Sequence, residues 1–171
     1  MKHDLNEVYK DFEKENITVL PFRFQHLKSV SLGDEKVVGI DRSKIDGCAE
    51  EYTILIHEKG HFDSGAFYTA SSPYLLKEQA ERRADRAAIL RYIPLEELRE
   101  CLAAGMVEIW DLAEYFGVTE ALCANAWSII GTRWECLFNL SGILSKKRYI
   151  SQYNCDKIGA KFNLPFWERI D

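Results

Sequence analysis

The pentapeptide His57-Glu58-Lys59-Gly60-His61 contains residue types that can bind a metal ion and use it. If this segment is helical, His57 and His61 lie one turn apart on the same face, because an α-helix repeats every 3.6 residues. Two imidazole nitrogens in this relation can occupy neighbouring corners of a tetrahedral Zn²⁺ site. Glu58 lies about 100° round the helix from His57. From there it can take a proton from a metal-bound water without being a ligand, as a general base does.

Two downstream carboxylates, Glu81 and Asp85, would complete such a site. They are spaced i and i+4 in a second helical stretch, Tyr74 to Arg91. Glu81 would be the third metal ligand and would leave the fourth position open for water. Asp85 would accept the free N–H of a ligand histidine. Taken alone, a charged stretch of this kind is usually a solvent-exposed helix face, but together with the two histidines it favours a metal site.

Three segments of the chain together resemble a known family. They are Ile56-His57-Glu58-Lys59-Gly60-His61, Glu81-Arg82-Arg83-Ala84-Asp85-Arg86-Ala87-Ala88 and Ile89-Leu90-Arg91-Tyr92-Ile93-Pro94. The ImmA/IrrE metallopeptidases pair H-E-x-G-H with a downstream E-x-x-A-D/N and an aliphatic stretch that ends in proline. The resemblance extends over residues 30–130, since residues 108–119 are similar to a helix-turn-helix-like segment of many members, especially those of phages and integrative elements. Lys59 departs from the family pattern, which commonly has an apolar residue there, and Ala87 replaces a residue that is frequently bulky.

The resemblance implies a zinc-dependent endopeptidase with a zincin-like α+β fold. It also implies the substrate, a helix-turn-helix repressor of a phage or mobile element, so that the protein would act as an anti-repressor. Zinc suits a His₂Glu ligand set, while Mn²⁺ or another divalent ion stays open. The alternative is a non-catalytic regulator that binds and sequesters a repressor or another protein partner.

The remaining patterns predict how the site is supported. Residues 4–16 are expected to form an amphipathic helix, and residues 17–24, 27–32 and 36–40 to form strands. A small antiparallel sheet packed on the metal-binding helix is the natural assembly, followed by a mainly helical C-terminal part. Residues 63–73 form a loop beside the metal. In it and just after it, Tyr68 and Tyr74 are either oxyanion stabilisers or ordinary loop aromatics.

Three regions are expected along the chain. Residues 1–94 form the zincin-like core, residues 95–130 a helix-turn-helix-like segment, and residues 131–171 a C-terminal extension docked on the core. A helix that reads DNA needs outward-facing Arg, Lys, Asn or Gln. Residues 120–127 offer only Asn125, so direct nucleic-acid binding is not expected and a platform for a protein partner is favoured.

Composition narrows the class of protein. The chain has 171 residues, of which 47% are hydrophobic, and a net charge of −5, which argues against a broad electrostatic grip on nucleic acid or an anionic membrane. Its start lacks the apolar core of a signal peptide, and no apolar run is long enough to span a bilayer. The five cysteines are scattered, with no C-x-x-C pair, which favours free thiols in a reducing compartment. A cytoplasmic location is therefore expected.

Overall fold

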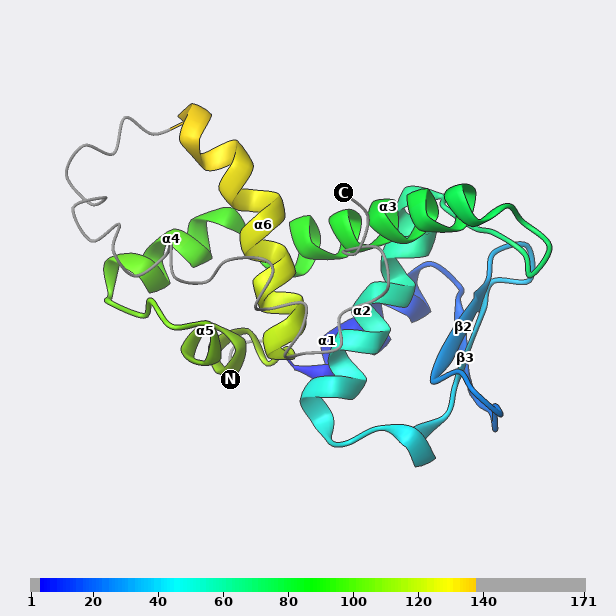
Figure 1. The fold of residues 1–171 in the computed structure, drawn as a ribbon. Coiled ribbons are helices and arrows are strands. Elements are labelled where there is room, and N and C mark those ends of the chain that lie inside the picture. Colours follow the sequence, from blue (N-terminus) through cyan, green and yellow to red (C-terminus); the bar gives the residue numbers. More distant parts are fainter. Residues whose placement is uncertain (1–3, 138–171) are drawn as a thin grey trace. The chain divides into compact units, whose positions relative to one another are not determined.

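The computed structural model describes residues 4–137, with side chains up to residue 130, and has an α+β architecture (Figure 1). The first of its two compact units ends at Ala126 and contains the predicted site. The elements in chain order are α1 (Leu5–Lys14), β1 (Thr18–Pro21), β2 (Ser29–Leu32), β3 (Val37–Ile40), a 3-10 turn (Arg42–Lys44), α2 (Cys48–Ser64), α3 (Tyr74–Tyr92), α4 (Leu95–Ala103), α5 (Ile109–Phe116) and α6 (Glu120–Leu137).

The sheet is mixed, so the expected purely antiparallel sheet is wrong. Its strand order is β1-β3-β2, with β2 antiparallel to β3 and β1 parallel to β3. The central position goes to the most apolar strand: Val38 and Ile40 of β3 are fully buried, whereas no residue of β1 or β2 is buried. The chain reverses direction between β1 and β2 and again between β2 and β3. As a result β3, which lies beside β1, runs in the same direction as β1.

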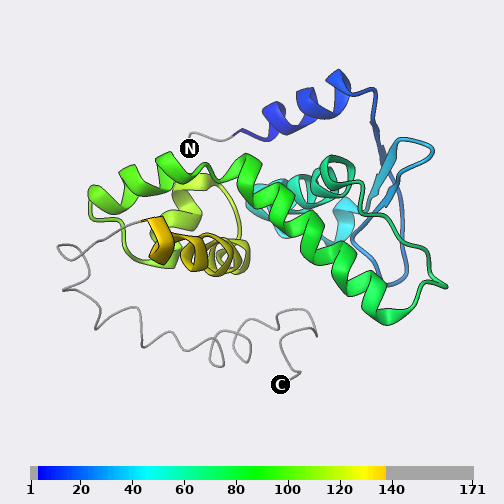
Figure 2. The same cartoon turned by 90° about the horizontal axis from the view of Figure 1, so that it is seen from above.

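Helix α2 is flanked by α1 and α3 (Figure 2). Its contact with α3 uses small residues: Gly60 lies against the backbone of Ala84, and Ala84 and Ala88 are fully buried. Because no large side chain separates α2 from α3 here, the two helices approach closely enough for side chains of one helix to meet side chains of the other. Val8 and Phe12 anchor α1 with no exposed surface.

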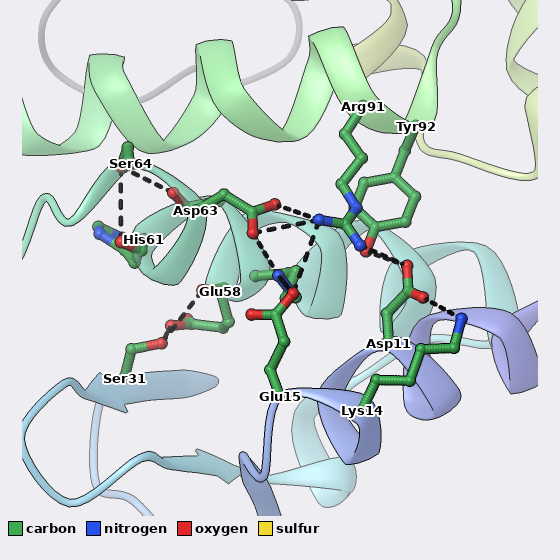
Figure 3. Close-up of polar contacts among 12 residues, drawn as sticks. Asp11, Lys14, Glu15, Ser31, Glu58, His61, Asp63, Ser64, Arg91 and Tyr92 are labelled. Carbon is green, nitrogen blue, oxygen red and sulfur yellow. Dashed lines mark hydrogen bonds and ion pairs between the residues drawn. The ribbon is translucent and has the colours of Figure 1, made fainter.

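A network of charged residues joins α1, α2 and α3 (Figure 3). Lys59 is completely buried, and its ammonium group pairs with Asp63 and, over 2.8 Å, with Glu15, the residue that caps the C-terminus of α1. Asp63 also pairs with Arg91 of α3 at 3.2 Å, and Arg91 contacts Asp11 of α1 at 3.0 Å. The buried charge of Lys59 is therefore compensated by carboxylates of α2 and of the end of α1.

The described chain after α3 is helical and consists of α4, α5 and α6. Gly117 ends α5 in the left-handed conformation, with φ of 68°, and the Thr119 hydroxyl caps α6 by accepting from the Leu122 N–H at 3.4 Å. Helix α6 runs to Leu137, beyond the predicted end at residue 130. Most of the predicted extension, from residue 138 onward, lies outside the described residues. Among the described helices, none combines the length and hydropathy that a membrane span requires.

Candidate metal centre

The side chains of His57, His61 and Glu81 converge between α2 and α3. The two Nε2 atoms lie 3.2 Å apart. Glu81 places Oε2 3.1 Å from Nε2 of His57 and Oε1 3.6 Å from Nε2 of His61. One ligand atom from each of the three residues thus lies within 4.8 Å of the others. The structure brings together the three residues that the sequence pattern selects as metal ligands.

The protons on the imidazole rings decide what this cluster can bind. Nδ1 of His57 lies 2.7 Å from Oδ1 of Asp85, and Nδ1 of His61 lies 2.6 Å from the carbonyl oxygen of Ala66. Carboxylates and carbonyls only accept hydrogen bonds, so each Nδ1 carries the proton. In a neutral ring, Nε2 is then a bare lone pair. Two lone pairs and a carboxylate therefore face one another, an arrangement that needs either a cation or an added proton.

The distances fit a tetrahedral ion of the size of Zn²⁺. With metal–ligand bonds of about 2.0–2.1 Å, neighbouring ligands at tetrahedral angles lie roughly 3.3–3.4 Å apart. The separation of 3.2 Å between the two Nε2 atoms and that of 3.1 Å between Nε2 of His57 and Oε2 of Glu81 lie close to that value, and the other oxygen of Glu81 lies 3.6 Å from Nε2 of His61. Three protein ligands leave one corner of the tetrahedron for water or substrate, as in catalytic zinc sites.

The electrostatics of the cluster favour a cation. Burial alone would raise the pKa of Glu81, but hydrogen bonds from His57 and Tyr68 outweigh it and lower the pKa to about 2. Burial alone would lower the pKa of His57, but hydrogen bonds to Asp85 and Glu81 outweigh it and raise the pKa well above its ordinary value. When no metal is bound, a proton on His57 therefore compensates the negative charges of Glu81 and Asp85.

Glu58 lies next to this cluster but outside the ligand group. It is only 4% exposed, and its carboxylate accepts hydrogen bonds from the hydroxyls of Ser29 and Ser31 on β2. Figure 3 shows the contact with Ser31. The two serines alternate along one strand, so both side chains point to the same face. Sequence reasoning missed them, and the only signal was their i, i+2 spacing within a predicted strand.

Two further residues, Tyr68 and Asn125, donate hydrogen bonds to Glu81 and Asp85. The hydroxyl of Tyr68 donates to Oε1 of Glu81, so of the two tyrosines left open by the sequence it is Tyr68 that the structure places on a ligand. The side-chain amide of Asn125 donates to Oδ2 of Asp85 over 3.0 Å. The alternative interpretation of this charged stretch as a solvent-exposed helix face is therefore wrong for Glu81 and Asp85. Both residues are partly buried and face α2.

Comparison with known proteins does not assign this chain to a family. The chain matches no family model, no curated protein and no solved structure in the three comparisons. The function must therefore be inferred from the residues of the site themselves.

Proposed function

We propose that this protein is a zinc-dependent endopeptidase of the ImmA/IrrE kind, with a zincin-like core. One observation carries the proposal: the Nε2 lone pairs of His57 and His61 and the carboxylate of Glu81 meet at separations that suit a tetrahedral ion. Glu58 adds a general base beside this group, which a purely structural metal site does not need.

The side chains of the site have distinct roles in this proposal. A bound Zn²⁺ would polarise a scissile carbonyl and lower the pKa of a water molecule towards neutrality. Glu58 accepts the proton of the attacking water and passes it to the leaving amine. Asp85 keeps the proton of His57 on Nδ1, and the carbonyl of Ala66 does the same for His61. Tyr68 orients the Glu81 carboxylate.

The position of Glu58 suggests how a polypeptide substrate would bind. Its carboxylate contacts β2, which is an edge strand of the sheet in the described part of the chain. An extended segment can add to such an edge through main-chain hydrogen bonds, which brings its peptide bonds close to Glu58. The family resemblance supplies the substrate class, a helix-turn-helix repressor of a phage or mobile element, whose cleavage would make this protein an anti-repressor.

The test uses the purified protein, Zn²⁺ and a helix-turn-helix repressor encoded next to it. Wild-type protein should cleave the repressor, whereas Glu58→Gln should bind zinc with unchanged stoichiometry and leave the repressor intact. Cleavage by Glu58→Gln at the wild-type rate would contradict the mechanism. If the variant relieves repression in cells without cleavage, the protein acts as the sequestering regulator instead.

A further inference from the structure

The amide of Asn125 lies at the outer end of a hydrogen-bond chain that reaches the candidate metal centre. Its Nδ2 donates to Oδ2 of Asp85 over 3.0 Å, and Oδ1 of Asp85 lies 2.7 Å from Nδ1 of His57. A carboxylate only accepts, so Asp85 receives one N–H from each neighbour and both of its oxygens are engaged. The orientation of Asp85, and through it that of His57, therefore depends on a residue of α6.

The first turns of α6 are held on the helices that carry the ligands. The backbone N–H of Thr119, just before α6, donates to the Thr53 hydroxyl of α2 over 2.9 Å. Leu122, Cys123 and Ala126 are buried, with 7%, 4% and 2% of their surface exposed. Apolar packing thus fixes the backbone from which the Asn125 amide reaches Asp85 on α3.

We infer that Asn125 is a positioning residue of the metal centre. Its amide holds Asp85 in the orientation that keeps the proton of His57 on Nδ1 and directs Nε2 towards Glu81 and His61. This inference rests on the proposed function, because it assigns Asn125 a role in metal binding. It also gives the segment of residues 95–130 a function of its own: a displacement of α6 would release Asp85 and weaken the site.

The test measures the zinc dissociation constant of the full-length protein by competition with a chelator. Asn125→Ala should raise this constant about tenfold, the lower end of the range for residues that support metal ligands. The effect is small because Asn125 contacts Asp85, which supports the ligand, and not the ligand His57 itself. Ser128→Ala, on an exposed position of the same helix, should leave it unchanged. Should Asn125→Ala fail to fold, the near-isosteric Asn125→Asp replaces it, since an ionised carboxylate cannot donate to Asp85.

A double-mutant cycle separates positioning from a general structural effect. In an Asp85→Ala background, Asn125→Ala should have no further effect on zinc affinity, because its only route to His57 is gone. In the metal-free protein, the Nδ1–H proton resonance of His57 should be protected in wild type and exchange faster in Asn125→Ala. An unchanged dissociation constant in Asn125→Ala, or equal losses in both backgrounds, would overturn this inference alone. A wild-type protein that binds no zinc would overturn the proposed function with it.

Discussion

A β-carbon on Gly60 would lie 2.2 Å from the carbonyl oxygen of Ala84, so α2 and α3 touch backbone to backbone at this point. Gly60 directly precedes His61, and Ala84 directly precedes Asp85. The two small residues of the H-E-x-G-H and E-x-x-A-D patterns are therefore the contact that lets Glu81 reach the histidines. Their role is geometric, whereas the flanking residues supply the chemistry.

Gly60→Ala tests this contact because two effects of the substitution have opposite signs. In a helix without a close neighbour, the change stabilises by roughly 1 kcal/mol. Here it should destabilise the fold by about 1–3 kcal/mol, the usual cost of overpacking, and should weaken zinc binding. Urea unfolding and a zinc titration measure both. A more stable variant with unchanged zinc affinity would show that the helices do not meet at Gly60.

Lys59→Met tests whether the buried ammonium group is dispensable. Lys59→Met removes the buried cation, but Asp63 keeps Arg91 as a partner and Glu15 stays 42% exposed to water, so the free energy of unfolding should change by less than about 1 kcal/mol. Asp63→Ala removes one partner of Lys59 and leaves a buried charge less well compensated, which should cost about 3 kcal/mol. The exposed Lys14→Met serves as control. Equal losses for Lys59→Met and Asp63→Ala would contradict this account.

Tyr68→Phe removes the hydroxyl that donates to Glu81 while keeping the aromatic ring. Zinc affinity should fall by about tenfold, less than the loss expected for any of the three ligands. Tyr74→Phe, at an exposed tyrosine at the start of α3, should leave the affinity unchanged. A loss as large in Tyr74→Phe as in Tyr68→Phe would show that the hydrogen bond to Glu81 does not orient this ligand.

The stabilising effect of zinc should increase with pH. The pKa of His57 is raised in the fold, so its protonated form stabilises the metal-free protein below the ordinary value of 6.5, and this contribution is lost as the pH rises through the raised pKa. Zinc needs His57 deprotonated, so the gain from metal binding grows over the same interval. Thermal unfolding with a chelator and with excess zinc measures the difference in Tm at each pH. His57→Ala should flatten this difference, and a difference independent of pH in wild type would contradict the assignment.

Helical periodicity accounts for the part of the site that the sequence predicted. The i, i+4 spacing of His57 and His61, and of Glu81 and Asp85, places each pair on one helix face whatever surrounds it. Gly117 at the end of α5 and Thr119 at the start of α6 are also residue types that favour these positions through local conformation and capping. These features depend on neighbours in sequence, and the residue types alone are sufficient to predict them.

The features that could not be predicted depend on residues far apart in the chain. The parallel pairing of β1 with β3 follows from which strand takes the buried centre, and no short pattern encodes that choice. Ser29 meets Glu58 across 29 positions, and Asn125 meets Asp85 across 40. The sequence suggests for Asn125 only a possible contact with DNA bases, because it does not show in which direction a half-buried amide points. The same holds for Lys59, since its partner Glu15 lies 44 positions away at the C-terminal end of α1.

The most direct test of the metal centre is a zinc titration that compares two chemically identical substitutions. Glu81→Gln removes the charge of a proposed ligand, and Glu96→Gln removes the same charge from an exposed position of α4. Wild type and Glu96→Gln should each bind one Zn²⁺ with the same affinity, while Glu81→Gln should bind at least about a hundredfold more weakly, since residues that only support ligands already cost 10–100-fold. Equal zinc affinity in Glu81→Gln and Glu96→Gln would show that Glu81 does not complete a metal site with His57 and His61.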